Sequence, residues 1–273
     1  MKIKFTKMHG LGNDFVMVDG YELESLPIES IQDFARNISN RYTGLGCDQF
    51  IIYKQHENYW SMNIYNNDGS KAMACGNGTR CLARLIHNIT NETNVVIKVG
   101  DKLLSCVVNS PYDISVNMGP VSFTGDWILP EDKILMLAKN YNLNPREIIC
   151  ADIGNPHLII FSQGLTDDDK KLLGAKLSVV ELFPEGVNVN FAQLQNNNIL
   201  LQVWERGVGF TLACGSGTCA SFAAACLLGY IDETKDCKVI FKLGSLSLKF
   251  NATRDVILSG PTEVVARGEY YYV

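Results

Sequence analysis

The chain has 273 residues, of which 47% are hydrophobic and 19% are charged, a composition typical of a folded globular protein. Its 24 basic and 29 acidic residues give a net charge of −5, so no basic surface for nucleic acid or an anionic membrane is expected. No segment approaches the roughly 18 consecutive apolar residues of a membrane span, and residues 1–10 contain no apolar signal-peptide core. Nine cysteines without such a signal indicate reduced thiols in the cytoplasm rather than a disulfide framework.

In chain order, the spacing of apolar residues predicts four helices and a larger number of strands. The helices are expected at residues 29–40, from the turn after Cys75 to near Asn88, at 131–140, and at 219–228 with Gly229 as the stop. The last of these is apolar nearly all round and should be surrounded by protein. Strands are expected at residues 62–65, 95–99, 103–108, 114–118, 158–161, 199–203, 239–243, 246–250, 256–258, 263–266 and 269–273.

Four short motifs recur in the same order about 140 residues apart. Residues 75–79 (Cys-Gly-Asn-Gly-Thr) return at 214–218 as Cys-Gly-Ser-Gly-Thr. The other motif pairs are 12–15 with 154–157, 46–50 with 186–191, and 119–120 with 260–261. We therefore predict an α+β fold of two pseudo-symmetric halves, each a mostly antiparallel β-sheet or barrel wrapped around a central helix. The halves are expected at 1–119, to which residues 263–273 return, and at 120–262, with the active site in the cleft between them.

Cys75 and Cys214 each precede a Gly-x-Gly-Thr turn and a helix. Backbone N–H groups at a helix N-terminus bind anions and lower the pKa of a nearby thiol from about 8.5. Two such thiols on opposite walls of one cleft are suited to inverting a carbon, because one thiolate removes a proton while the opposite thiol supplies one. Most other cysteines, such as Cys106 and Cys226, are expected to be small core residues.

Two other uses of the cysteines are less favoured by the residues around them. Zinc ligands are typically separated by two to four residues, and Cys81 and Cys219 are expected on apolar helix faces, so we expect no metal. A single thiol nucleophile would need a histidine partner, whereas His56 and His87 lie in polar segments. His9 is compatible with either a structural or a lining position.

Polar residues near the two cysteines fit a small charged ligand. Arg206 offers a fork for a carboxylate. Singly, each nearby asparagine is more typical of a turn, but the set occupies equivalent positions in the two halves and can hold an ammonium and carboxylates. This set comprises Asn13, Asn66, Asn155 and Asn188.

At these residues the sequence resembles the diaminopimelate epimerase family. The family signature Asn-x-Asp-Gly-Ser, four residues, then Cys-Gly-Asn-Gly-x-Arg runs from Asn66 to Arg80, and further family motifs lie at 9–15, 154–157, 205–207 and 213–218. The resemblance covers residues 3–270 and implies a cytoplasmic, homodimeric, cofactor-independent epimerase. Such an enzyme interconverts L,L- and meso-diaminopimelate, its small-molecule substrate, in lysine and peptidoglycan precursor biosynthesis. Phe210 stands where the family usually has glutamate.

The resemblance also implies roles for individual residues. Cys75 and Cys214 would be the catalytic pair, Cys75 taking the proton from the L,L isomer and Cys214 from the meso isomer. His157 would lie near the reacting carbon in a supporting role. The implied substrate-binding residues are Asn13, Gln49, Asn66, Gly76, Asn77, Asn155, Asn188, Glu205, Arg206, Gly215 and Ser216.

Without the family resemblance, the residues predict only an enzyme that inverts a carbon of a small carboxylated molecule. One alternative is a related cofactor-independent racemase for proline, hydroxyproline or histidine. Another is a thiol-dependent binding protein that leaves the α-hydrogen of its amino acid in place.

Overall fold

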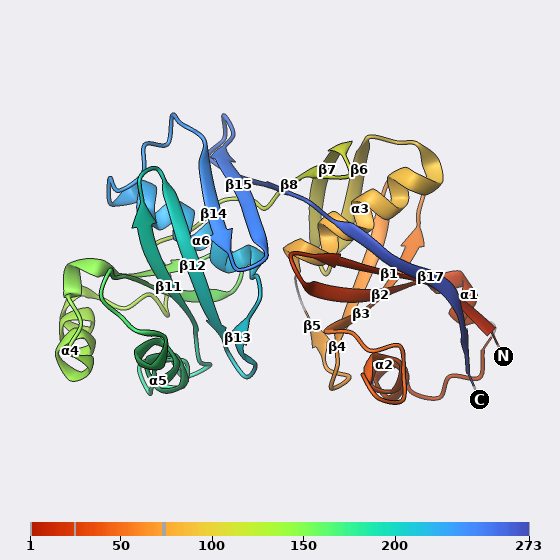
Figure 1. The fold of residues 1–273 in the computed structure, drawn as a ribbon, viewed down its shortest axis with the longest axis horizontal. Helices are drawn as coiled ribbons and strands as arrows, with labels where there is room; N and C mark the ends of the chain where they lie inside the picture. Colours follow the sequence, from red (N-terminus) through yellow and green to blue (C-terminus); the bar gives the residue numbers. More distant parts are fainter. Residues whose placement is uncertain (1, 25, 73–74, 273) are drawn as a thin grey trace. The chain divides into compact units, whose positions relative to one another are not determined.

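The computed structural model describes residues 2–24, 26–72 and 75–272. The chain forms two compact units (Figure 1). Unit one contains the residues up to Asn117 and those from Ser259 onward, and unit two is Met118–Leu258. The predicted first half was 1–119 with 263–273, and the predicted second half was 120–262. The terminal residues Met1 and Val273 lie outside the described part of the chain.

Unit one is built on strands that are mostly antiparallel. β1 pairs antiparallel with both β2 and β17, so the end of the chain returns to the first strand. The pairs β2–β3 and β4–β6 are parallel, whereas β3–β4, β4–β5, β6–β7 and β7–β8 are antiparallel. The strands are β1 (Lys2–Gly10), β2 (Asn13–Asp19), β3 (Gln49–Gln55), β4 (Trp60–Asn66), β5 (Lys71–Ala72), β6 (Asn94–Val99), β7 (Lys102–Ser110), β8 (Asp113–Asn117) and β17 (Glu263–Tyr271).

The helix α3 (Gly76–Thr90) lies against the sheet of unit one (Figure 1). Its predicted apolar stripe of Cys81, Leu82, Leu85 and Ile86 is buried, which confirms the helical periodicity. The helix was expected to end near Asn88 but continues to Thr90. It ends there because the next residue, Asn91, adopts the left-handed backbone conformation of a helix C-cap. Two shorter helices, α1 (Gly20–Glu24) and α2 (Ile31–Ser39), complete the unit, and the first of them was not predicted.

Unit two repeats the strand pairing of unit one. The pairs β9–β10, β11–β12, β12–β13 and β14–β15 are antiparallel, and β10–β11 and β12–β14 are parallel. Each pairing has its counterpart in unit one, in the same chain order. The strands are β9 (Ile148–Asp152), β10 (Pro156–Phe161), β11 (Asn188–Gln195), β12 (Asn198–Glu205), β13 (Gly209–Thr211), β14 (Cys237–Phe241) and β15 (Gly244–Phe250). The strand β16 (Val256–Gly260) begins in unit two, and its last two residues belong to unit one.

The helix α6 (Gly215–Leu227) is the counterpart of α3, and all but one of its residues from Gly215 to Ala225 are buried. The predicted enclosure of an all-apolar helix is therefore confirmed. α4 (Glu131–Tyr141) was also predicted, whereas α5 (Asp167–Leu177) was not. A single 3₁₀ turn, η1 (Pro145–Glu147), precedes β9.

The prediction of buried cysteines holds for Cys106, which is 1% exposed, but it is wrong for Cys226. Cys226 is only half-buried because it lies in the last turn of α6, next to the exposed Leu227.

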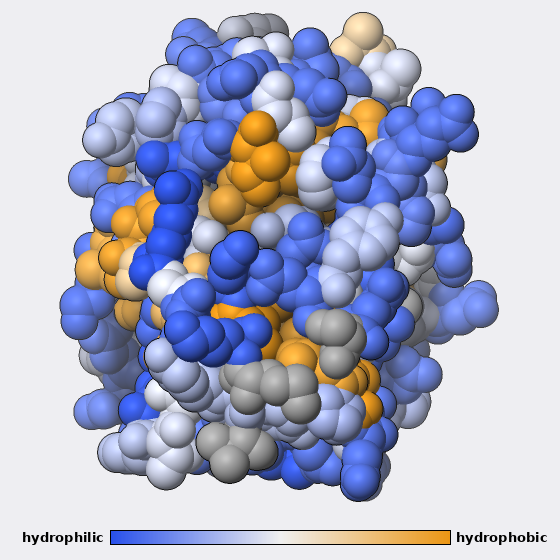
Figure 2. Space-filling view, turned by 90° about the vertical axis from the view of Figure 1, so that its right-hand side faces the viewer, coloured by the Kyte–Doolittle hydropathy of each residue, from blue (hydrophilic) through white to orange (hydrophobic). Residues whose placement is uncertain are grey.

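On the side of unit one that carries α1 and the end of β17, the surface is largely hydrophilic, with small hydrophobic patches between the polar residues (Figure 2). Across the described ranges, each helix is too short or too polar to cross a membrane.

Candidate active site

Each of the two helices α3 and α6 begins at a cysteine. Cys75 and Cys214 are the N-cap residues, both in extended backbone conformation. The Gly78 N–H donates to the sulfur of Cys75 at 3.3 Å, and the Gly217 N–H donates to that of Cys214 at 3.4 Å. The two thiols thus take the place that a serine or aspartate usually has in a helix cap, where the helix dipole favours negative charge.

In unit one, three predicted binding residues lie at the same edge of the sheet as Cys75. Asn13 and Gln49 begin the parallel strands β2 and β3, and Asn66 ends the antiparallel β4. Gln49 and Asn66 are directly paired in register, and the Gln49 side chain donates to Asn66 Oδ1 at 2.9 Å. Asn66 in turn donates to Ser70 Oγ at 3.0 Å, so its amide is held at the start of the signature motif.

The amide oxygen of Asn13 faces the start of α3. The Cys75 thiol donates to Asn13 Oδ1 at 3.7 Å, and the Asn77 side chain donates to the same oxygen at 3.2 Å. Asn77 is 2% exposed and accepts a hydrogen bond from the fully buried Arg80 at 2.7 Å. The structure therefore brings Asn13, Cys75, Gly76 and Asn77 together, and it adds Arg80 as a buried cation in the first turns of the helix.

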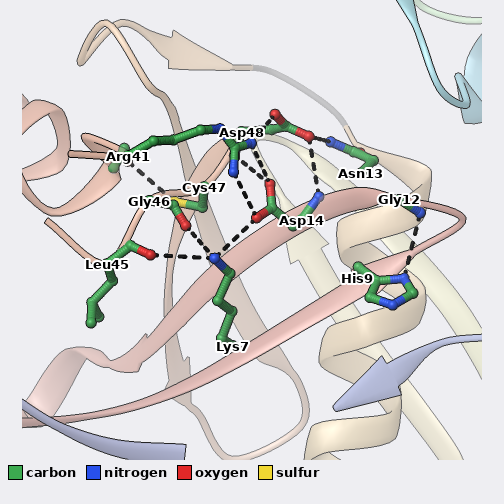
Figure 3. A network of polar contacts seen from close by, with 11 residues as sticks. Lys7, His9, Gly12, Asn13, Asp14, Arg41, Leu45, Gly46, Cys47 and Asp48 are labelled. Atoms are coloured by element: carbon green, nitrogen blue, oxygen red, sulfur yellow. Dashed lines mark hydrogen bonds and ion pairs between the residues drawn. The ribbon is translucent and has the colours of Figure 1, made fainter. Parts of the chain in front are cut away.

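A network of charged side chains orients Asn13 (Figure 3). Asp48 Oδ2 accepts from Asn13 Nδ2 at 3.0 Å, which leaves Asn13 Oδ1 directed at Cys75 and Asn77. Arg41 bonds Asp48 at 2.7 Å and Asp14 at 2.8 Å, and Lys7 lies 3.2 Å from Asp14. Although burial opposes it, the hydrogen bond from Arg41 helps to lower the pKa of Asp14, so the Asp14 carboxylate remains ionised.

In unit two, the equivalent edge carries the other predicted binding residues. Asn188 begins β11 and Glu205 ends the antiparallel β12, while Asn155 immediately precedes β10. Asn188 Oδ1 accepts the Arg206 backbone N–H at 2.9 Å, and Glu205 accepts from Thr211 Oγ1 at 2.6 Å.

The exposed Arg206 guanidinium donates to the backbone carbonyls of Glu185 and Gly186 through Nη1. These bonds hold the guanidinium beside Gly186, at the turn that leads into β11.

A chain of polar contacts reaches Cys214 from the interior of unit two. His157 Nε2 lies 3.1 Å from Ser216 Oγ, which lies 3.5 Å from the Cys214 sulfur. Asn155 Nδ2 donates to the same Ser216 oxygen at 3.3 Å. His157 is fully buried, and burial lowers its pKa to about 4, so the imidazole is neutral near pH 7. His157 therefore lies beneath Ser216 and contacts Cys214 through it.

Two features of unit two lay outside the predicted site. Asn190, on β11 and fully buried, donates to His157 Nδ1 at 3.0 Å. No strand is predicted at residues 188–195, and only the parallel pairing of β10 and β11 shows that Asn190 has a histidine as its neighbour. Phe210 packs edge-on against Trp204 with ring centroids 5.1 Å apart and remains 41% exposed.

Units one and two each contain groups whose chemistry is suited to proton transfer. Each supplies a sulfur within hydrogen-bond distance of a helix-start N–H, together with neutral amides for polar substituents. Among the described residues, no group of three or more His, Cys, Asp and Glu side chains is arranged to hold a metal ion.

Solved structures first define the class of fold. A protein described as a predicted epimerase from Pseudomonas aeruginosa is similar with a TM-score of 0.73 at 13% identity, covering 99% of this chain and 100% of that one. A hydroxyproline epimerase from Agrobacterium vitis gives a TM-score of 0.67 at 14% identity, covering 98% and 92% of the two chains. The fold is therefore the one found in these epimerases.

Sequence comparison is more specific. The model of the diaminopimelate epimerase family matches residues 5–124 and 149–266. The diaminopimelate epimerase of Rickettsia felis is 52% identical over 270 residues, covering 99% of this chain and 98% of that protein. This chain belongs to the diaminopimelate epimerase family.

Proposed function

We propose that this protein is a diaminopimelate epimerase that uses Cys75 and Cys214 as its two bases. The observation that carries the proposal is the repeated geometry of the two cysteines, each of which caps a helix and accepts a backbone N–H through sulfur. The enzyme would interconvert L,L- and meso-diaminopimelate, supplying the meso form for lysine and peptidoglycan precursor synthesis. We further propose that the thiols of Cys75 and Cys214 face one substrate from opposite sides.

The proposed reaction needs one thiolate and one thiol at the start of each turnover. The thiolate takes the α-hydrogen as a proton, and the electron pair left on the carbon delocalises into the α-carboxylate. The opposite thiol then gives its proton to the other face of the carbon and becomes a thiolate. Atoms and charge balance without any redox step, and the two sulfurs have exchanged roles at the end. The N–H groups at the starts of α3 and α6 would stabilise the charge that develops on the carboxylate.

Substrate recognition would be divided between the predicted polar residues of both units. We assign the α-carboxylate to the N–H groups of Gly76, Asn77, Gly215 and Ser216, because helix N-termini bind carboxylates. The amides and the carboxylate of Glu205 would hold the ammonium groups, and Arg206 would take a carboxylate as a fork. These substrate-binding amides belong to Asn13, Gln49, Asn66, Asn155 and Asn188.

We also expect a homodimer and a cytoplasmic location, as the family resemblance implies. The strand β17 supports an association surface, since most of it is exposed and its Val265 and Tyr271 are 55% and 65% exposed. Light scattering in solution would measure the mass directly, and a monomer at micromolar concentration would refute the dimer.

Proton exchange measured by NMR in deuterated water tests the proposed function. We expect the α-proton signal of diaminopimelate to disappear with the wild-type enzyme, and not with the Cys75→Ala or Cys214→Ala variants, which should still bind substrate. Cys226→Ala is the matched control, because this half-buried thiol lies at the far end of α6 from Cys214. Exchange with proline, hydroxyproline or histidine instead would indicate a related racemase, and binding without exchange would indicate a binding protein.

A further inference from the structure

The two cysteine environments differ at one pair of interior positions. In unit one, β2 and β3 place Phe15 and Ile51 beneath the start of α3, and both are fully buried. In the equivalent register of unit two, β10 and β11 carry His157 and Asn190.

The helix-start glycines confirm this equivalence. A Cβ on Gly78 would meet Ile51 at 2.9 Å, and a Cβ on Gly217 would meet Asn190 at 2.4 Å. An apolar pair therefore suffices to pack a helix of this kind, and the polar pair distinguishes the surroundings of Cys214.

The contacts of Asn190 fix which way its amide points. Its Nδ2 lies 3.2 Å from the Leu158 carbonyl oxygen and 3.3 Å from the Asn188 carbonyl oxygen, and only an NH₂ group can donate to both. The same NH₂ group lies 3.0 Å from His157 Nδ1, so this ring nitrogen must accept and carries no proton. The neutral imidazole is therefore protonated on Nε2.

The tautomer of His157 sets the direction of the next hydrogen bonds. The Nε2–H faces Ser216 Oγ at 3.1 Å and Asn155 Oδ1 at 3.3 Å, and Asn155 Nδ2 donates to Ser216 Oγ as well. With these donors directed at its oxygen, the Ser216 hydroxyl is left to donate its own hydrogen to Cys214, whose sulfur is 3.5 Å away.

We propose that Asn190 is a positioning residue: by donating to Nδ1 it holds His157 as the Nε2-protonated tautomer, which makes the Ser216 hydroxyl a donor to the Cys214 sulfur. A donor stabilises a thiolate more than a thiol, because hydrogen bonds to an ionised acceptor are the stronger ones. The catalytic part of this inference rests on the proposed function, whereas the tautomer does not.

The packing around Asn190 agrees with such a role. Its Oδ1 is buried and has no hydrogen-bond partner among the described residues, which costs stability that an apolar side chain would avoid. The benefit of an asparagine at this position therefore comes from the hydrogen bond that its Nδ2 donates to His157.

The tautomer can be read by NMR in protein labelled with ¹⁵N-histidine. Two-bond ¹H–¹⁵N correlations should show His157 protonated on Nε2 in the wild type, with a His157→Gln variant identifying its signals among the four histidines. Asn190→Asp places an acceptor opposite Nδ1 and should move the proton to that nitrogen or add a second one. Ser221→Ala is the matched control, since this buried hydroxyl of α6 has no partner among the described residues and its loss should leave the tautomer unchanged.

Kinetics then test whether the tautomer matters for catalysis. Asn190→Asp and Asn190→Leu should lower kcat for diaminopimelate about tenfold or more and change KM by less than about threefold, the loss expected for one hydrogen bond to a charged group. Alkylation of Cys214 by iodoacetamide at pH 7, followed by peptide mapping, should slow by a similar factor, and Ser221→Ala should match the wild type.

Several outcomes would overturn the inference. A wild-type His157 protonated on Nδ1 would do so, as would a folded Asn190→Leu enzyme with unchanged kcat and unchanged alkylation of Cys214. If Asn190→Asp did not fold, Asn190→Leu and Ser216→Ala would carry the kinetic test. Absence of epimerase activity in the wild type would refute the proposed function instead, and the NMR and alkylation measurements would still decide the role of Asn190.

Discussion

Replacing Gly217 by alanine should destabilise unit two far more than the equivalent change destabilises unit one. A Cβ on Gly217 would lie 2.4 Å from Asn190 Oδ1, an overlap that cannot persist. Asn190 cannot yield easily, because its amide is tied to His157 and to two backbone carbonyls. We expect a loss of about 1–3 kcal/mol in the free energy of unfolding, from overpacking and weakened hydrogen bonds.

Two other glycines provide the comparison. Gly217→Ala and Gly78→Ala gain the same helix propensity of roughly 1 kcal/mol, so the difference lies in the clash. In Gly78→Ala the new Cβ meets the flexible end of Ile51 at 2.9 Å, which can rotate away. Gly164 has no atom within 4 Å of the added Cβ, so Gly164→Ala should change stability by less than about 0.5 kcal/mol.

Urea unfolding followed by circular dichroism measures all three variants. Equal losses in Gly217→Ala and Gly78→Ala, or a neutral Gly217→Ala, would show that Asn190 is not held as described.

Three further outcomes are expected. Arg206→Ala should weaken diaminopimelate binding about tenfold or more in calorimetry, since a hydrogen bond between charged groups is lost; unchanged affinity would refute its role as the carboxylate fork. Because the pKa of His157 is about 4 when folded and 6.5 when exposed, the unfolded chain binds the extra proton, and stability should fall by about 3 kcal/mol as the pH drops from 6.5 to 4. His157→Phe introduces the residue type of its unit-one counterpart, Phe15, and should flatten this decline in urea titrations at several pH values. An equally steep decline in the variant would contradict the assignment of the pH dependence to the buried His157. Mild oxidation should link Cys75 to Cys214, with activity lost, restored by a dithiol and protected by substrate; peptide mapping that finds other pairs would place the two thiols in separate sites.

Local patterns in the sequence were sufficient to predict both cysteine turns. A cysteine followed by Gly-x-Gly-Thr and an apolar stripe predicts a turn that leads into a helix. In the structure the Gly-x-Gly-Thr residues are themselves the first helical turn, so α6 begins at Gly215 and not at the predicted residue 219. The helix α5 was missed although its Thr166 and Asp169 form a capping box, because few of its residues are apolar and only a weak stripe results.

Contacts that depend on strand register were not predictable in the same way. Asn190 and His157 are 33 residues apart, and Asp48 and Asn13 are 35 apart. His157 and Asn190 meet because β10 and β11 are parallel neighbours. Asn13 meets Asp48, the residue before β3, because β2 and β3 are parallel neighbours. The sequence shows that these residues are polar, but not which partner satisfies them.

The position of the deuterium label early in the reaction tests the two-base account most directly. With L,L-diaminopimelate in deuterated water, NMR or mass spectrometry at low conversion compares the product with the recovered substrate. If one thiol removes the proton and the other delivers a solvent-derived one, the product should carry deuterium while the remaining substrate stays largely unlabelled. Equal early labelling of substrate and product would indicate a single shared base and would contradict the assignment of Cys75 and Cys214 to opposite faces of one carbon.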